Sequence, residues 1–130
     1  MQPAAKQGDR IVATDIHIVM IPTPGGPVPV PLPHPFMGML DGSLSADVFI
    51  GGKAAAMQGS TATNSPPHIP QGGPFQTPPK DRAEVMLGSA TVFVNGKPLA
   101  RNGDVCLTCN DPADLPGGQV IAVGAVFGGG

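Results

Sequence analysis

The chain contains an internal repeat, and this repeat limits the folds that are open to it. Residues 45–60 (SADVFIGGKAAAMQGS) and 89–104 (SATVFVNGKPLARNGD) are two copies of one unit. They share a serine, a valine-phenylalanine pair, a glycine-lysine pair and a later glycine at the same spacing. A unit of this size cannot cover its own apolar face, so its copies are expected to stack or to surround a common axis.

Each copy of the repeat predicts a β-hairpin. A short apolar run comes first, at residues 48–50 and again at residues 92–94. The next two residues are Gly51-Gly52 or Asn95-Gly96, pairs that tolerate the positive φ angles of a two-residue primed turn. The chain then returns through small residues.

A third copy is split between the two ends of the chain. Residues 3–9 (PAAKQGD) match the return half at 98–104 (PLARNGD), and residues 125–129 (AVFGG) resemble the outgoing half. If these halves pair, the termini meet and three similar hairpins surround one axis. We therefore predict an all-β fold in a single domain over residues 1–130: a small cone of three pseudo-threefold-related β-hairpins with Pro/Gly-rich connectors and little helix.

Glycine and proline are abundant, with 19 and 17 of the 130 residues. Aperiodic sequences of this kind are usually disordered. Here the glycines recur at matched turn positions and 41% of residues are hydrophobic, so we expect an ordered chain. No segment free of Gly and Pro keeps a 3.6-residue apolar period, which argues against helices.

Charge and motifs exclude several functions. The net charge is −2, the seven Lys and Arg residues are scattered, and there is no Trp or Tyr, so we expect no nucleic-acid partner. No phosphate-binding loop, nucleophile elbow or zinc-protease helix motif occurs. The start lacks the apolar core of a signal peptide and no segment has the length of a membrane helix, so we expect synthesis in the cytoplasm.

Three histidines and two cysteines carry the metal-binding chemistry of the sequence. His17, His34 and His68 lie outside the apolar runs of the hairpins, and so do Cys106 and Cys109. Three imidazoles and one thiolate suit tetrahedral Zn²⁺ and would tie separate connectors together. The alternative is solvated loop histidines and small buried cysteines. The residues alone leave both interpretations open.

Two other chemistries are less well supported. A redox role for Cys106 and Cys109 is disfavoured, because the prolines and glycines that follow leave no helix to lower a thiol pKa. The aspartates mostly neighbour Gly or Pro and are expected to form turns; Asp15 is counted among them.

The return segments resemble a known repeat. Pro3-Ala4-Ala5-Lys6 and Pro98-Leu99-Ala100-Arg101, each followed by x-Gly-Asp, are similar to the proline-alanine-alanine-arginine (PAAR) repeat family, and the resemblance covers nearly the whole chain. There are departures: Lys6 replaces Arg, Leu99 replaces Ala, and the middle copy reads AAAM at residues 54–57. The segment 18–40 is longer and richer in proline than a minimal member needs, and its path stays open.

The resemblance implies a non-enzymatic tip that caps the trimeric β-helical spike of a contractile injection system and sharpens it for membrane puncture. That system would be a type VI secretion system or a phage-tail-like particle. Family members hold a structural Zn²⁺ near the apex through three histidines and one cysteine. Carried over to this chain, the ligands are His17, His34, His68 and Cys109, with Cys106 in reserve. Four protein ligands leave no open position for a catalytic water.

The implied partner is a spike trimer of the valine-glycine repeat type or of the phage β-helix type, with one tip per trimer. Three similar hairpins in one chain avoid a symmetry mismatch with a trimer. The residues expected to dock are the apolar runs Val48, Phe49, Ile50, Val92, Phe93 and Val94. Any effector would be a separate chain, and contact with the target membrane would be transient. We expect the chain in the cytoplasm as made, then in the particle, and outside the cell or in a target cell after firing.

Two other functions remain as alternatives. A zinc hydrolase or deaminase would keep three protein ligands, a water and a nearby glutamate base; Glu84 is the only glutamate. A metal-free Pro/Gly-rich adaptor is the second. Neither accounts for the hairpin repeat as well.

Overall fold

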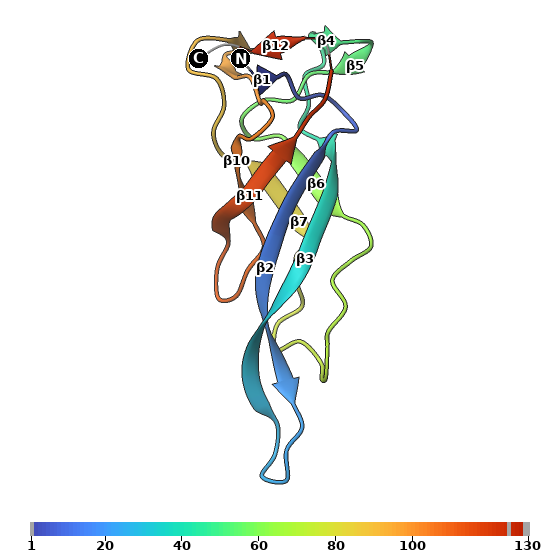
Figure 1. Cartoon of the computed structure of the whole chain (residues 1–130), viewed down its shortest axis with the longest axis vertical. Helices are drawn as coiled ribbons and strands as arrows, with labels where there is room; N and C mark the ends of the chain where they lie inside the picture. The colour runs from blue at the N-terminus through green and yellow to red at the C-terminus, as the bar shows by residue number, and fades with distance from the viewer. Residues whose placement is uncertain (1, 125, 129–130) are drawn as a thin grey trace.

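Three structural levels follow one another along the long axis of the molecule (Figure 1). Short two-stranded sheets form a broad base, a closed barrel forms the middle, and one long hairpin extends to a narrow apex. This computed structural model describes residues 2–124 and 126–128. All regular elements within these residues are β-strands, which confirms the predicted all-β class. None of the described residues form a helix long and apolar enough to cross a membrane.

The base consists of the three hairpins that the repeat predicts. The strand pairs are β4 (Phe49–Ile50) with β5 (Lys53–Ala54), β8 (Phe93–Val94) with β9 (Lys97–Pro98), and β1 (Gln2–Pro3) with β12 (Phe127–Gly128). The φ angles are 57° and 82° at Gly51 and Gly52, and 51° and 78° at Asn95 and Gly96, as a primed turn requires. Pairing of β1 with β12 brings the two chain ends together; Ala125 and Gly129 of the predicted outgoing half lie outside the described residues.

The three return strands meet at a pseudo-threefold axis. The backbone N–H of Ala5 donates to the carbonyl of Ala100, that of Ala100 to Ala56, and that of Ala56 to Ala5, with N···O distances of 2.9, 3.0 and 3.0 Å. All three alanines are fully buried. The neighbouring bridges follow the same rotation: Ala4 with Arg101, Lys6 with Ala55, and Met57 with Leu99. A small residue recurs at this position because three backbones converge there.

Enlarging one of these axial alanines should destabilise the fold. Ala56→Leu adds volume where no surface is exposed, so the three strands must move apart. We expect the free energy of unfolding to fall by about 1–3 kcal/mol, measured by denaturant titration. Ala54→Leu, in the partly exposed strand β5, is the matched control. Equal stability of the two variants would contradict the axial arrangement.

The middle of the cone is a closed six-stranded barrel in the order β10-β11-β2-β3-β6-β7. These strands are β2 (Arg10–Ile21), β3 (Val28–Gly42), β6 (Thr61–Asn64), β7 (Arg82–Val85), β10 (Val105–Thr108) and β11 (Leu115–Ile121). The main apolar core fills the barrel and includes Ile11, Phe36, Leu40, Val85 and Val120. The sequence predicts connectors in place of these strands. Strands β6, β7 and β10 have only four residues each, which leaves little alternating pattern, and the repeated prolines of β3 argue against a strand.

Strands β2 and β3 continue past the barrel as a hairpin, which gives the path of residues 18–40. Their register runs from Arg10 opposite Met39 to Ile21 opposite Val28. In β3 every second residue from Pro29 to Pro35 is a proline. Successive residues of a strand donate to opposite sides, so the residues between these prolines keep the ladder with β2. The prolines remove the donors from the outer edge, which hinders pairing with another chain.

Candidate metal centre

Buried side chains with metal-binding atoms meet inside the molecule. Asp15, His17, His68 and Cys109 place one ligand atom each within 4.8 Å of all the others. His34 adjoins them, with its ring centroid 5.7 Å from that of His17 and 5.6 Å from that of His68. All five residues are buried. The structure thus brings together the three predicted histidines, Cys109 and an aspartate.

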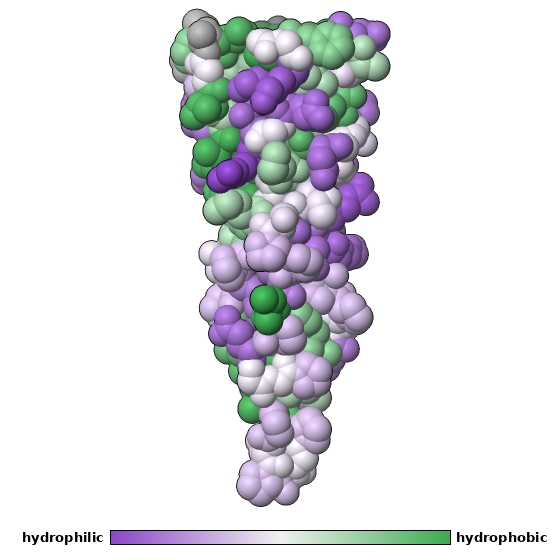
Figure 2. Space-filling model, turned by 90° about the vertical axis from the view of Figure 1, so that its right-hand side faces the viewer, coloured by the Kyte–Doolittle hydropathy of each residue, from purple (hydrophilic) through white to green (hydrophobic). Residues whose placement is uncertain are grey.

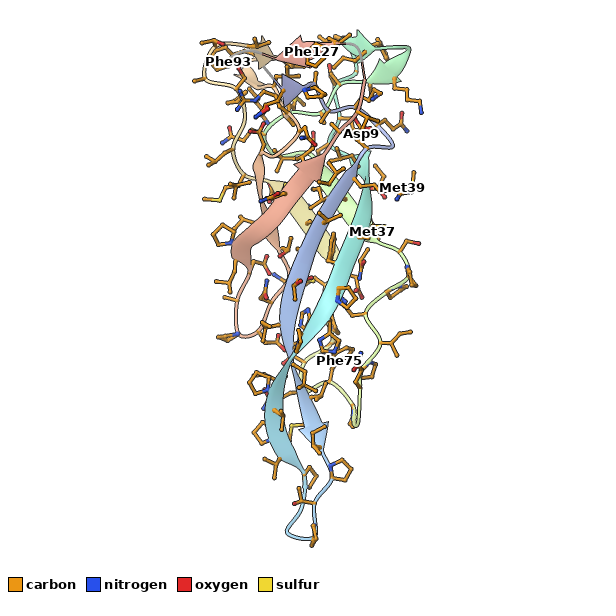
Figure 3. The ribbon with its side chains drawn as sticks, viewed as in Figure 1. Asp9, Met37, Met39, Phe75, Phe93 and Phe127 are labelled. Atoms are coloured by element: carbon orange, nitrogen blue, oxygen red, sulfur yellow. The ribbon has the colours of Figure 1, made fainter. Side chains whose placement is uncertain are left out.

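The ladder between β2 and β3 positions three of these residues. Asp15 and His17 are two residues apart on β2, so their side chains point to the same face. His34 is the direct cross-strand partner of Asp15. Figure 3 shows Phe75 where the hairpin leaves the barrel; its ring centroid lies 5.8 Å from that of His17 and 5.3 Å from that of His34. An aromatic ring therefore borders the histidines on the side of the apex.

Two loops supply the other donors. His68 lies between β6 and β7, and its backbone N–H donates to Asp81 Oδ1 at 2.8 Å. Asn64 Nδ2 also donates to Asp81 Oδ1, at 3.2 Å, and lies 3.3 Å from His68 Nδ1. Cys109 follows β10, and the next residue, Asn110, accepts the Ile16 N–H at 2.6 Å. Side-chain hydrogen bonds thus fasten both loops to the barrel.

Four polar atoms of this cluster are buried without a hydrogen-bond partner in the described part of the chain: Asp15 Oδ1, His17 Nδ1, His17 Nε2 and His34 Nε2. Unpartnered buried polar atoms are costly and rare in folded proteins. His34 Nδ1 lies 2.9 Å from the Leu32 carbonyl, so it carries the proton and leaves a lone pair on Nε2. A second hydrogen bond of this kind is typical of histidines that bind metals. The orphaned atoms therefore fit an ion at their centre.

The surroundings of His34 favour its neutral form. Burial lowers the pKa of His34, and the neighbouring His68 and His17 lower it further. The Leu32 carbonyl and Asp15 act in the opposite direction but are outweighed. Neutral imidazole is the form that binds a metal.

Both cysteines are free, buried thiols. Burial, followed by the charge of Asp15, raises the pKa of Cys109 to about 12, and its S–H donates to Asp15 Oδ2 at 3.3 Å. Burial, with a contribution from Asp104, raises the pKa of Cys106 to about 12 as well. Thiolates are the reactive form, so this pair is poorly suited to redox chemistry. A metal ion would displace the Cys109 proton.

The donor set suits Zn²⁺, which binds nitrogen, sulfur and carboxylate oxygen in closed sites. Cys106 does not reach the group; it packs in the barrel core with its sulfur 3.7 Å from the Asp104 carbonyl oxygen. Asp15 was missed by sequence reasoning, because it lies in the middle of β2 and not in a turn. Its spacing of two residues from His17 in an apolar run was the available signal. The assignment of ligands stays a prediction.

The predicted docking residues lie at the base but not all face outward. Phe49 and Phe93 are 60% and 58% exposed, and Val48 and Val92 are also exposed. Val94 is buried in a second small core, and Ile50 packs against it. Val126 and Phe127 of the split hairpin, which were not predicted, occupy the equivalent exposed positions, with Phe127 50% exposed. Figure 3 shows Phe93 and Phe127 at the base, and the face shown in Figure 2 carries strongly apolar and strongly polar residues side by side toward that wide end.

Comparison with protein families gives a match to the model described as the PAAR motif, over residues 20–112 of the 130-residue chain. The matched part contains the long β3 strand, the two uninterrupted base hairpins, His34, His68 and Cys109; it begins after Asp15 and His17. The search of curated proteins gives no match.

Proposed function

This chain belongs to the PAAR motif family, and from this membership we propose that it caps the trimeric β-helical spike of a contractile injection system. Residues 1–130 would act as one non-enzymatic tip domain, stabilised by Zn²⁺. It would be made in the cytoplasm, assembled onto the particle, and carried outside the cell or into a target cell on firing. The main support for this proposal is the arrangement of side chains on the base of the cone.

Three equivalent pairs of apolar side chains are exposed on that base: Val48 with Phe49, Val92 with Phe93, and Val126 with Phe127. Clusters of exposed large apolar residues on a soluble protein usually mark an interaction site. Three equivalent pairs around one axis match a partner with threefold symmetry, one chain per trimer. Capture of the chain by an immobilised spike trimer tests this directly. A correctly folded chain that the trimer does not retain would reject the docking role.

The metal would have a structural role. The cone narrows toward the site, so only a few side chains are available there to form an apolar core. An ion bound by residues from β2 and from two loops would hold these three segments together instead. A site filled by protein donors has no open position for activating water. This arrangement supports a structural metal over the hydrolase or deaminase alternative.

The two cysteines should differ sharply in metal retention. Cys109 lies in the donor group and Cys106 does not. We expect Cys109→Ala to lose most of its bound zinc during dialysis, and Cys106→Ala, the matched control, to keep it. Elemental analysis of the purified proteins measures this. Equal zinc content in both variants would show that Cys109 is not a ligand.

The hairpin that β2 and β3 form beyond the barrel has properties that suit brief entry into a membrane. No Asp, Glu, Lys or Arg occurs between Ile16 and Leu40, and charges are costly in hydrocarbon. Unpaired backbone donors are costly there too. The prolines remove these donors from the outer edge of β3. On the outer edge of β2, the N–H groups of Ile16, Ile18 and Met20 donate to Asn110 Oδ1, Asp111 Oδ2 and the Pro74 carbonyl.

A charge on this hairpin should impair delivery. Val28 and Met39 lie on the same strand and are 44% and 52% exposed, but Val28 is next to the apex and Met39 is near the base. In cells that carry the native injection system, we expect Val28→Lys to reduce delivery of a reporter effector at least about tenfold, since an inserted charge costs about 2.5–3.5 kcal/mol. Met39→Lys should deliver normally. Equal delivery by both variants would count against membrane entry by the hairpin.

A further inference from the structure

Asp15 is an acidic side chain whose buried surroundings offer few partners to its two oxygens. It is 0% exposed and lies inside the barrel on β2. Within the described residues its one ion-pair partner is His68, with 2.8 Å between His68 Nε2 and Asp15 Oδ2, and no lysine or arginine lies within pairing distance. The second oxygen, Oδ1, has no hydrogen-bond partner there. An ionised carboxylate buried in this way costs several kcal/mol unless a cation compensates it.

The position of the carboxylate indicates which cation would compensate it. Asp15 Oδ2 lies 2.8 Å from His68 Nε2 and 3.3 Å from Cys109 Sγ. Around a tetrahedral zinc ion with bonds of about 2.0–2.3 Å, neighbouring ligand atoms are about 3.3–3.8 Å apart. The oxygen is therefore at ligand spacing from Cys109 Sγ and at hydrogen-bond distance from His68 Nε2, so a bound ion would require these two atoms to separate by about 0.5 Å. Together with one ligand atom of His17, one ligand atom from each of these three residues forms a group in which every pair lies within 4.8 Å.

Charge balance supports the same conclusion. An ion with two positive charges, bound by one thiolate and otherwise by neutral imidazoles, would leave one net positive charge in a buried site. Uncompensated buried charge is strongly unfavourable. The carboxylate of Asp15 brings the total to zero, whether or not His34 also binds.

We propose that Asp15 coordinates the ion through its carboxylate and that, with the Cys109 thiolate, it neutralises the centre. This inference rests on the metal centre of the proposed function and adds a ligand to it. The ligand set that it extends is the predicted one of three histidines and one cysteine.

Cobalt(II) loading gives a direct test, because the visible absorption of Co²⁺ reports the atoms bound to it. The proteins compared are the full chain, Asp15→Asn and the control Asp111→Asn. Asp111 is a suitable control because its Oδ2 lies 3.5 Å from His17 Nδ1 but outside the group of four donors. We expect Asp15→Asn to shift the energy and intensity of the d–d bands and to weaken Co²⁺ binding at least about tenfold. Asp111→Asn should keep the band positions of the full chain. Wild-type band positions in Asp15→Asn would overturn the inference.

A second measurement needs no substitution and covers the case in which Asp15→Asn does not fold. In a crystal structure of the zinc-loaded chain, we expect an Asp15 oxygen at about 2.0–2.2 Å from the ion. An oxygen beyond about 3 Å is at hydrogen-bond range or farther and would overturn the inference, while leaving the metal centre intact. A folded chain that binds neither Zn²⁺ nor Co²⁺ would reject both the inference and the proposed centre.

Discussion

Removing the metal ion should lower the melting temperature of this chain by more than about 10 °C. In a domain of this size, a loss of 1 kcal/mol shifts the melting temperature by roughly 3–5 °C, and structural zinc contributes about 10–16 kcal/mol in small peptides that fold around it. Because the barrel and the base would keep part of their structure, we expect the free energy of unfolding to fall by several kcal/mol and not by the full value seen in such peptides. Calorimetry before and after chelation, with metal content verified, measures the effect.

The physical reason is the set of groups that the ion leaves behind. Without it, Asp15 Oδ1, both nitrogens of His17 and His34 Nε2 are buried and have no hydrogen-bond partner in the described part of the chain. Each such group costs about 1–3 kcal/mol. Melting that is unchanged after complete metal removal would reject a structural role for the ion.

A double variant separates loss of the ion from loss of packing. His34→Ala with His68→Ala removes two buried rings beside the centre and should melt well below the wild type. The informative comparison is sensitivity to chelator. We expect chelation to lower the melting temperature of the wild type and to leave that of the double variant unchanged. A chelator effect of equal size in both proteins would show that the two histidines do not hold the metal.

Charged residues on the base should weaken docking to the spike trimer. Val92→Lys with Phe93→Lys replaces one of the three apolar pairs with two charges that would be buried on binding. Central aromatic residues at interfaces contribute about 2 kcal/mol or more each, so we expect at least about a thirtyfold loss of affinity in co-purification or surface-capture experiments. Undiminished recovery of the complex would contradict docking through this face.

The pseudo-threefold base allows two matched controls. Leu115→Lys with Ile121→Lys places two charges on exposed apolar residues of the barrel strand β11 and should leave docking unchanged. The double change at Val48 and Phe49 alters the equivalent pair of another hairpin and should weaken docking about as much as the change at Val92 and Phe93. A large difference between these two hairpins would argue against equivalent contacts with three spike subunits.

The base could be predicted from the sequence because its determinants are local. The Gly51-Gly52 and Asn95-Gly96 pairs lie next to the short strands that they connect, and both pairs have the positive φ angles expected of them. The match between residues 3–9 and 98–104 predicted that the two ends pair, and β1 pairs with β12. Similar local sequences formed similar hairpins, so the repeat was sufficient to predict the strand pairs of the base.

The orientation of individual side chains was less predictable. Val94 and Phe93 are neighbours in one apolar run, but Phe93 is exposed and Val94 is buried. In a strand, adjacent residues point to opposite faces, so the last residue of each three-residue docking run, Ile50 or Val94, faces the small core of the base. The sequence shows which residues of a strand share a face, because side chains alternate with a period of two. Which of the two faces is exposed depends on what the hairpin packs against.

The amino-acid sequence by itself determined the repeated hairpins, the absence of charge from residues 16–40, and the kinds of donor atom available for a metal. Only the tertiary structure decided that the connectors close into a barrel, that β2 and β3 extend to the apex, and that Asp15 joins the histidines. Asp15 and Cys109 are in contact although 94 positions separate them in the chain. Turn conformation depends on a few adjacent residues, whereas this contact depends on how distant strands pair around a closed barrel, and no local pattern specifies that pairing.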